Sequence, residues 1–154
     1  MAALWTNYAI WLPLTAAVLV QAYKFFWEWH TAGDFDFQVL YRSGGMPSSH
    51  TAMVTSLATV IGWQEGVGTT NFAIAVIVST VVMYDARGVR QESGKQARVL
   101  NRIVHEFFRG EPIGEEELKE LVGHTTQQVL VGALFGVSFT LLCLWLLGVK
   151  PYGQ

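Results

Sequence analysis

VLVGALFGVSFTLLCLWLLGV, residues Val129–Val149, is the most hydrophobic stretch of the chain and decides its fold class. It contains no charged residue and, at about 20 residues, is long enough to cross the hydrocarbon core of a bilayer as a helix. A second uncharged stretch of similar length, Leu4–Tyr23, is followed by Lys24. Because it lacks the preceding basic segment of a signal peptide, we expect a retained helix. Both stretches predict transmembrane helices.

Two shorter apolar stretches lie between these spans, namely Met46–Trp63 and Asn71–Tyr84, the latter followed by Asp85. Each alone also suits a buried core helix, but their position between two spans favours membrane helices. The composition agrees, because 14% charged residues is well below the roughly 25% of soluble domains. The sequence therefore predicts one domain over residues 1–154, an all-α integral membrane bundle of about four transmembrane helices.

A polar segment separates the third and fourth spans, and Ser93–Phe108 within it has the pattern of an amphipathic helix. Leu100, Ile103, Val104 and Phe107 recur at helical spacing along one side. We expect this helical insertion to lie on the membrane surface.

The basic residues gather on one side of the predicted bundle. Because four spans alternate in direction, the end of the first, the start of the second, the end of the third and the start of the fourth share one membrane face. Among the 10 lysines and arginines, only Lys150 falls on the other face. The positive-inside rule then predicts an integral protein of the cytoplasmic or plasma membrane, with its basic face toward the cytoplasm. The net charge of -2 gives no sign of nucleic-acid binding.

The motif GGMPSSH, which begins at residue 44, opens the second span on that face. Gly45 and its neighbour allow a sharp turn, and Pro47 suits the first turn of a helix. The backbone N–H groups of Ser48, Ser49 and His50 then lack partners within the helix and form an anion site, for which phosphate is the natural ligand. The alternative is a polar N-cap beneath a membrane helix, with His50 held by a neighbour.

Several cations are predicted to surround this turn. Lys24, Arg42, Arg87 and Arg90 fall on the same face, and together they can hold the oxygens of a phosphate. For Lys24 the alternative is an ordinary snorkelling side chain at the end of a span.

His124 precedes the fourth span on the same face, where its alternative role is contact with lipid headgroups. Two histidines beside a phosphate suggest that one attacks phosphorus and the other protonates the leaving alkoxide. A nucleophilic histidine needs an acceptor for its other nitrogen, and Gln128, one helical turn on, and Asp85 are the candidates. For Asp85 the alternative is a pairing with Arg87 or Arg90 at the end of the third span.

Together these residues resemble the divergent PAP2 family, membrane proteins related to acid phosphatases and vanadium-dependent haloperoxidases. The resemblance runs from Gln21 to about Gly136. It rests on Gln21-x-x-Lys24, on GGMPSSHTA, on YDARGVR followed by GKQA and LN, and on LKELVGH. It implies hydrolysis of a lipid or polyprenyl phosphate or diphosphate through a phosphohistidine, with no cofactor and no metal.

The resemblance also implies roles for single residues. Lys24 and Arg42 match the first phosphate-binding motif of the wider superfamily, although they are spaced more widely than in its pattern. Ser48, Ser49 and His50 match the second motif, in which the histidine is the acid.

In the third motif, Arg90 or Arg87 supplies the arginine and His124 the nucleophile. Relatives commonly have a glutamate where this chain has Gln128, and an amide stabilises a cationic histidine less than a carboxylate does. The leading function is therefore a membrane phosphatase, a phosphoric monoester or diphosphate hydrolase. The alternative is a non-catalytic binder or transporter of phosphorylated lipids.

Two further expectations concern metals and partners. Asp85 and Glu92 suggest a metal-dependent phosphatase, which the neighbouring cations disfavour. Gly132 and Gly136 form a small-xxx-small pair of the kind found where membrane helices associate, so a homodimer is expected. The other expected partners are a phosphorylated lipid or isoprenoid substrate and the membrane itself.

Overall fold

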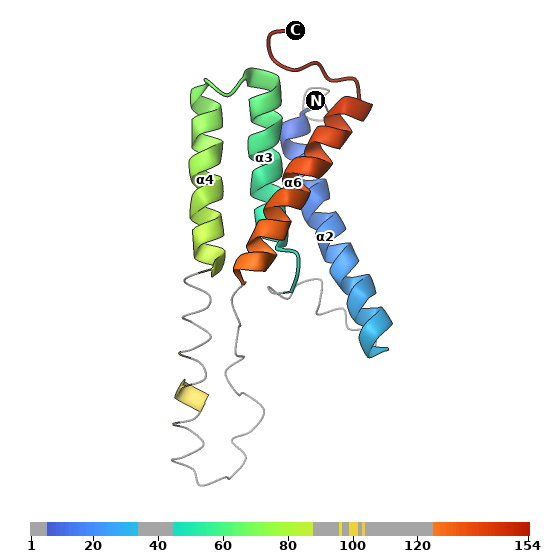
Figure 1. The fold of residues 1–154 in the computed structure, drawn as a ribbon, viewed down its shortest axis with the longest axis vertical. Helices are drawn as coiled ribbons and strands as arrows, with labels where there is room; N and C mark the ends of the chain where they lie inside the picture. Colours follow the sequence, from blue (N-terminus) through green and yellow to red (C-terminus); the bar gives the residue numbers. More distant parts are fainter. Residues whose placement is uncertain (1–5, 34–44, 88–95, 97–98, 102, 104–124) are drawn as a thin grey trace.

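The computed structural model describes residues 6–33, 45–87 and 125–154, together with the helical positions 96, 99–101 and 103. The three continuous ranges form four helices (Figure 1). They are α2 (Tyr8–Ala32), α3 (Ser49–Glu65), α4 (Thr70–Arg87) and α6 (Thr126–Leu146). The predicted all-α fold is confirmed for this part of the chain. Most of the amphipathic helix predicted over Ser93–Phe108 lies outside the described residues.

Helix α2 is longer than the first predicted span. It begins after Asn7, whose side-chain oxygen accepts a hydrogen bond from the N–H of Ala9 at 3.0 Å. It runs through Lys24 and ends before Gly33, whose φ of 77° is the left-handed conformation of a helix C-cap. The prediction that the helix ends at Lys24 is wrong, because a lysine is a good helix former and the chain reaches no helix-breaking residue before this glycine.

Two of the four helices are long and apolar enough to cross a membrane, namely α2 over Tyr8–Thr31 and α6 over Thr126–Leu146. In each, only 28% of the apolar window is buried inside the protein, so most apolar side chains point outward. Exposed apolar residues include Leu14, Val18, Ile77, Val81, Leu134 and Leu142. Such continuous outward apolar surface needs a bilayer rather than water around it.

Helices α3 and α4 are shorter than α2 and α6. With 17 and 18 residues they are about 26 and 27 Å long, slightly less than the roughly 30 Å of a bilayer core. That α3 and α4 each span the membrane stays a prediction.

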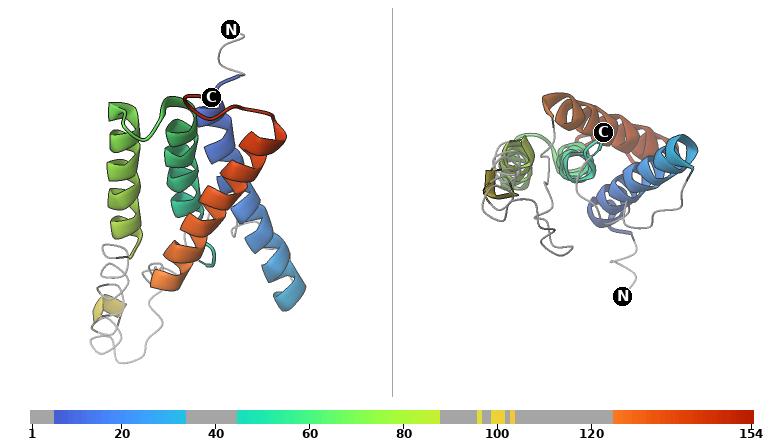
Figure 2. Two further views of the ribbon diagram at one scale, coloured as in Figure 1. Left: turned by 45° about the horizontal axis from the view of Figure 1, so that its top comes forward. Right: turned by 90° about the horizontal axis from the view of Figure 1, so that it is seen from below.

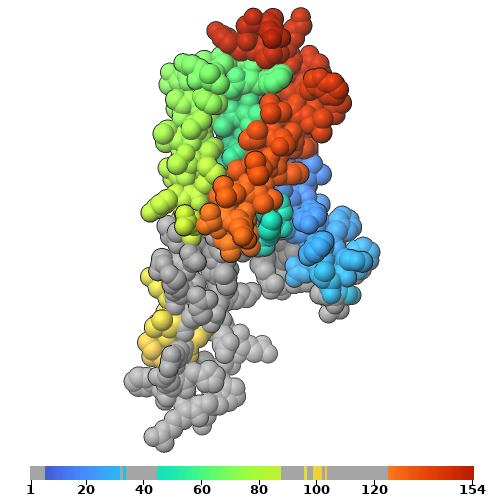
Figure 3. Space-filling model, viewed as in Figure 1, coloured from blue at the N-terminus to red at the C-terminus, as the bar shows by residue number. Residues whose placement is uncertain are grey.

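Helix α3 lies at the centre of the bundle and packs against α2, α4 and α6 (Figure 2). In the space-filling view it appears as a narrow band between α4 and α6 (Figure 3). Its composition suits this position, because most of its buried residues are alanine, serine or threonine, which allow neighbouring helices to approach closely. They are Ser49, Thr51, Ala52, Val54, Thr55, Ser56 and Val60.

The close approach of α6 to α3 occurs at two glycines. A Cβ added at Gly132 would lie 2.6 Å from the backbone oxygen of Ser48. One added at Gly136 would press on the backbone oxygen of Ala52 and the hydroxyl of Thr55. The glycine pair predicted to support a homodimer therefore faces α3 within the same chain, and it gives no support for an interface between chains.

Hydrogen bonds of buried hydroxyl groups join α3 to the neighbouring helices α6 and α4. Ser56 Oγ and Thr140 Oγ1 of α6 lie 2.6 Å apart, and both residues are fully buried. Ser79 of α4 donates to the backbone oxygen of Val54 at 2.9 Å. In hydrocarbon such bonds specify which helix faces meet, because a lone hydroxyl there has no water to replace its partner.

We expect the Ser56–Thr140 bridge to appear as energetic coupling between α3 and α6. In the variants Ser56→Ala, Thr140→Val and the double variant, the coupling should be about 0.6 to 1.7 kcal/mol, the usual range for interhelical hydrogen bonds in membranes. The free energy of unfolding in mixed detergent micelles measures it. Strictly additive losses would contradict the bridge.

The C-terminal segment closes the end of the bundle opposite to the start of α3. The indole Nε1 of Trp63 donates to the backbone oxygen of Val149 at 2.9 Å, and the N–H of Tyr152 donates to the backbone oxygen of Trp63 at 2.7 Å. Below this closure, Leu12, Val60 and Leu144 form the apolar core shared by α2, α3 and α6.

Candidate functional site

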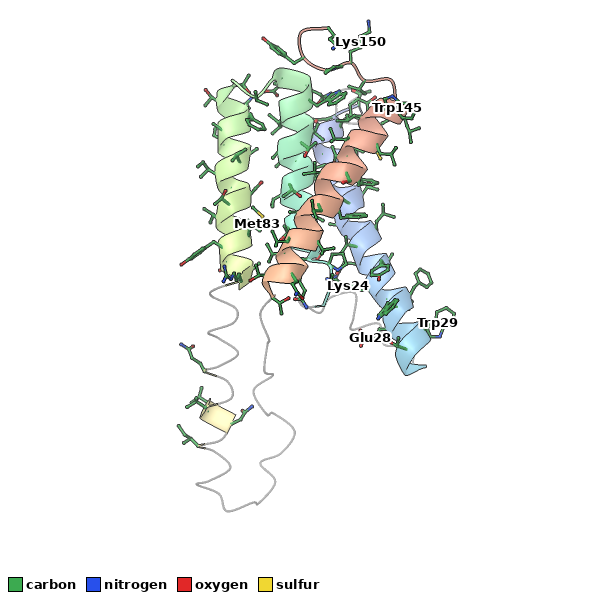
Figure 4. The ribbon with its side chains drawn as sticks, in the orientation of Figure 1. Lys24, Glu28, Trp29, Met83, Trp145 and Lys150 are labelled. Carbon is green, nitrogen blue, oxygen red and sulfur yellow. The ribbon has the colours of Figure 1, made fainter. Side chains whose placement is uncertain are left out.

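The fold brings the described residues of the predicted site to one end of the bundle. The end of α2, the start of α3, the end of α4 and the start of α6 all lie at the lower end in Figure 1. Lys24 lies there, whereas Lys150 lies at the opposite end (Figure 4). These four helix ends therefore lie together, as alternating helix directions require, and that this end is one face of the membrane stays a prediction.

Lys24 lies against the turn that precedes α3. A Cβ added at Gly45 would lie 3.7 Å from Cδ and 3.8 Å from Cε of the lysine. Gly45 has a φ of 74°, a conformation that favours glycine, so the backbone of the turn suits this residue. Lys24 itself is only 8% exposed. It is therefore packed between α2 and the glycine turn, in contrast to a snorkelling lysine, whose charged head stays in water.

The turn ends in an N-cap at Ser48. Its hydroxyl oxygen accepts hydrogen bonds from the N–H of Thr51 at 3.4 Å and from the hydroxyl of Thr51 at 3.0 Å. The helix begins at Ser49, so Pro47 precedes the cap and does not lie in the first turn as the sequence predicted. The physical reason is that the serine side chain has an oxygen that can accept a hydrogen bond from an N–H of the first turn, whereas the proline side chain has none.

One of the three backbone donors predicted for the anion site has a protein partner. The N–H of Ser48 donates to the backbone oxygen of Gln128 at 3.0 Å, and Ser48 is fully buried. The expectation that this N–H faces a ligand is wrong. The bond instead ties the start of α3 to the start of α6. The N–H of Ser49, which follows in the first turn, is a further backbone candidate for an anion.

Gln128 has a structural role that its predicted catalytic role did not include. Its side-chain oxygen accepts the N–H of Thr125 at 3.0 Å, while its own N–H donates to the Thr125 hydroxyl at 3.3 Å. This is a capping box, which starts α6. The sequence carries its signature, a threonine followed three residues later by a glutamine, and that signal identifies the cap. The cap fixes the chain immediately after His124, which lies outside the described residues.

The other predicted residues are divided between described and undescribed parts. Asp85 and Arg87 close α4 at the same end of the bundle, and within the described part of the chain they do not form the ion pair considered above. Arg42 and Arg90 lie outside the described residues, as does Glu92. Among the residues that the structure describes, no group of three or more histidine, cysteine, aspartate or glutamate side chains is placed to hold a metal ion.

A groove of about 380 Å³ lies beside the first turn of α3, between that helix and α2. It is lined by Ala17, Val18, Gln21, Ala22, Ser49, His50 and Met53. Small alanines on α2 leave the space open, and Ser49 and His50 form its polar end.

Comparison with known proteins agrees with the motifs. The model of the family described as the divergent PAP2 family matches residues 5–139. A relative from Bacillus subtilis (strain 168), described as the uncharacterized membrane protein YuiD, is 34% identical over 148 residues, which cover 89% of this chain and 94% of the relative. No solved structure matches the chain. Because the family match spans most of the sequence and includes the turn before α3, the chain belongs to the divergent PAP2 family, as its motifs predicted.

Proposed function

We propose that this protein is a membrane phosphatase that acts on lipid or polyprenyl phosphates or diphosphates. The observation that carries the proposal is the packing of the Lys24 side chain against Gly45, at the turn that leads into Ser49 and His50. Lys24 is only 8% exposed, and a cationic side chain near the first turn of a helix is a favourable setting for a phosphate, because charge-assisted hydrogen bonds gain strength where water is excluded.

The chemistry follows the roles implied by the family. The imidazole of His124 attacks phosphorus, and the phosphorus–oxygen bond to the lipid breaks as the phosphoryl group transfers to nitrogen. His50 gives its proton to the leaving alkoxide, which departs as a lipid alcohol or, from a diphosphate, as a lipid phosphate. Water then attacks the phosphohistidine, its proton returns to His50, and inorganic phosphate leaves.

The proposal is tested by phosphate release from purified protein in detergent. With no metal added and with a chelator present, we expect turnover of at least one member of a panel of lipid and polyprenyl phosphates. Vanadate should inhibit it, because vanadate adopts the five-coordinate geometry of the transition state. Release that disappears in chelator would favour the metal-dependent alternative, and no release from any member would contradict the proposal.

A second candidate function, a non-catalytic binder or transporter of phosphorylated lipids, is favoured by Gln128. Its side-chain oxygen is engaged in the capping box, and as an amide it gives His124 less support than a carboxylate would.

The variant Gln128→Glu separates the two functions. A glutamate also completes a capping box, so α6 should begin as before while a negative charge is added four residues after His124 in the sequence. For a phosphatase we expect kcat to rise about tenfold. This corresponds to a decrease of about 1.4 kcal/mol in the activation free energy, caused by better stabilisation of the cationic histidine. Phosphate binding without any turnover in either protein would favour the binder.

The orientation of the site belongs to the proposal as well. With the basic face in the cytoplasm, substrate enters from the inner leaflet. Labelling of Lys150 by a membrane-impermeant amine reagent in intact cells, with none in inside-out vesicles, is the expected result.

A further inference from the structure

The groove between α2 and α3 runs from the proposed phosphate site toward the middle of the membrane. Its polar end is formed by Ser49 and His50, which the phosphate site also uses. On α2, Gln21 lies three residues before Lys24 and Ala17 lies seven before it. With about 1.5 Å of rise per residue, these two lining residues lie about 5 and 10 Å from the lysine along the helix.

The side of the groove is open to the surroundings of the bundle. Val18, which forms part of its rim, is 65% exposed, and Leu14, one turn further along α2, is 46% exposed. In a bilayer these side chains face lipid tails. A hydrocarbon chain can therefore enter the groove sideways from the membrane while its headgroup stays at the end of the bundle.

The lining tells which chain fits. Beyond Ser49 and His50, the walls are the apolar side chains of Ala17, Val18, Ala22 and Met53, with Gln21 as the polar exception. A glycerol backbone with two ester groups would place several carbonyl oxygens against these walls, and burying polar groups without partners is unfavourable. A chain in which carbon follows directly after the phosphate oxygen meets no such cost.

We propose that this groove binds the first hydrocarbon segment of a single-chain, ester-free phosphate, such as a polyprenyl phosphate. The inference rests on the proposed function, because it takes the phosphate to lie at Lys24, Ser49 and His50. It adds the substrate class: phosphates that carry one hydrocarbon chain are preferred to diacylglycerol phosphates. The volume of about 380 Å³ agrees, since it is near the lower end for ligand pockets and suits one chain segment.

The experiment narrows the groove with Ala17→Leu and compares it with Ala73→Leu, which makes the same change at an exposed position of α4. Rates are measured with farnesyl phosphate, with p-nitrophenyl phosphate, which has no chain, and with a diacyl phosphatidate. Wild-type protein should prefer farnesyl phosphate to the phosphatidate. In Ala17→Leu, the ratio of kcat/KM for farnesyl phosphate to that for p-nitrophenyl phosphate should fall about tenfold, as for the loss of roughly two buried methylene groups. In Ala73→Leu this ratio should stay at the wild-type value.

A second measurement decides the matter even if the protein releases no phosphate. A farnesyl phosphate analogue with a photoreactive diazirine in its first isoprene unit is crosslinked to the protein, and the labelled peptides are identified by mass spectrometry. We expect label on the peptides that contain Ala17 and Met53, and a severalfold loss of it in Ala17→Leu. Labelling of these peptides without any phosphate release would contradict the proposed phosphatase activity but support binding of the hydrocarbon chain in the groove. Equal labelling of α4 and α2, an unchanged substrate ratio in Ala17→Leu, or a wild-type preference for phosphatidate would overturn the inference.

Discussion

Gly136→Val should abolish the stable fold of the protein in detergent. Position 136 is one of two glycines at which α6 approaches α3 closely, and a Cβ there would press on the backbone oxygen of Ala52 and the hydroxyl of Thr55. Backbone atoms cannot rotate away as the end of a flexible side chain can, so the two helices must separate. We expect a loss of at least about 3 kcal/mol in the free energy of unfolding, the upper end of ordinary overpacking. Thermal unfolding followed by circular dichroism, together with gel filtration, measures it.

The matched control is Ser138→Val, which places the same side chain on the exposed side of α6. Because that side faces lipid or detergent, the free energy of unfolding should change by less than about 0.5 kcal/mol. Equal stability of the two variants would contradict the close packing of α6 on α3. If Gly136→Val left the fold intact and only changed the molecular mass in solution, the glycine would instead lie between chains.

Lys24→Met should reduce kcat/KM for phosphate release by about a hundredfold or more. Methionine keeps the apolar contacts of the buried lysine stem, which packs against Gly45, but removes the ammonium. Loss of one preorganised group that stabilises charge in the transition state typically slows an enzyme about 100- to 1000-fold. The measurement is a steady-state phosphate assay on protein shown by gel filtration to be folded.

Lys150→Met is the control for this change, because it removes a lysine at the opposite end of the bundle. Its activity should equal that of the wild-type protein. A Lys24→Met variant that is folded and fully active would show that the lysine supports only packing, and the phosphate site would then have to lie elsewhere.

Much of the fold follows from hydropathy alone. A long uncharged stretch has few alternatives to a membrane helix, so α6 and the first part of α2 are predicted within a few residues. The continuation of α2 past Lys24 is not, because hydropathy records where a helix leaves the apolar layer and not where its backbone hydrogen bonds stop. The left-handed Gly33, which ends the helix, is the better signal.

The common face of the site residues was also predictable, since it needs only the alternation of helix directions. What the sequence could not reveal is how the helices share their polar groups. The hydrogen bond from Ser48 to Gln128 joins positions 80 residues apart and depends on the packing permitted by Gly132. A prediction from the local sequence alone therefore counts too many backbone N–H groups as available to a ligand when another helix packs against the turn.

The measurement that tests the central claim most directly is trapping of the phosphorylated protein. Wild-type protein and the His124→Ala variant are mixed with a polyprenyl phosphate that carries the radiolabel in its phosphate group. The reaction is then quenched in base, in which phosphohistidine survives. The account predicts label on the wild-type protein, lost on treatment with acid, and none on His124→Ala, which should also release no phosphate. Label retained by His124→Ala, or turnover by that variant at the wild-type rate, would contradict it.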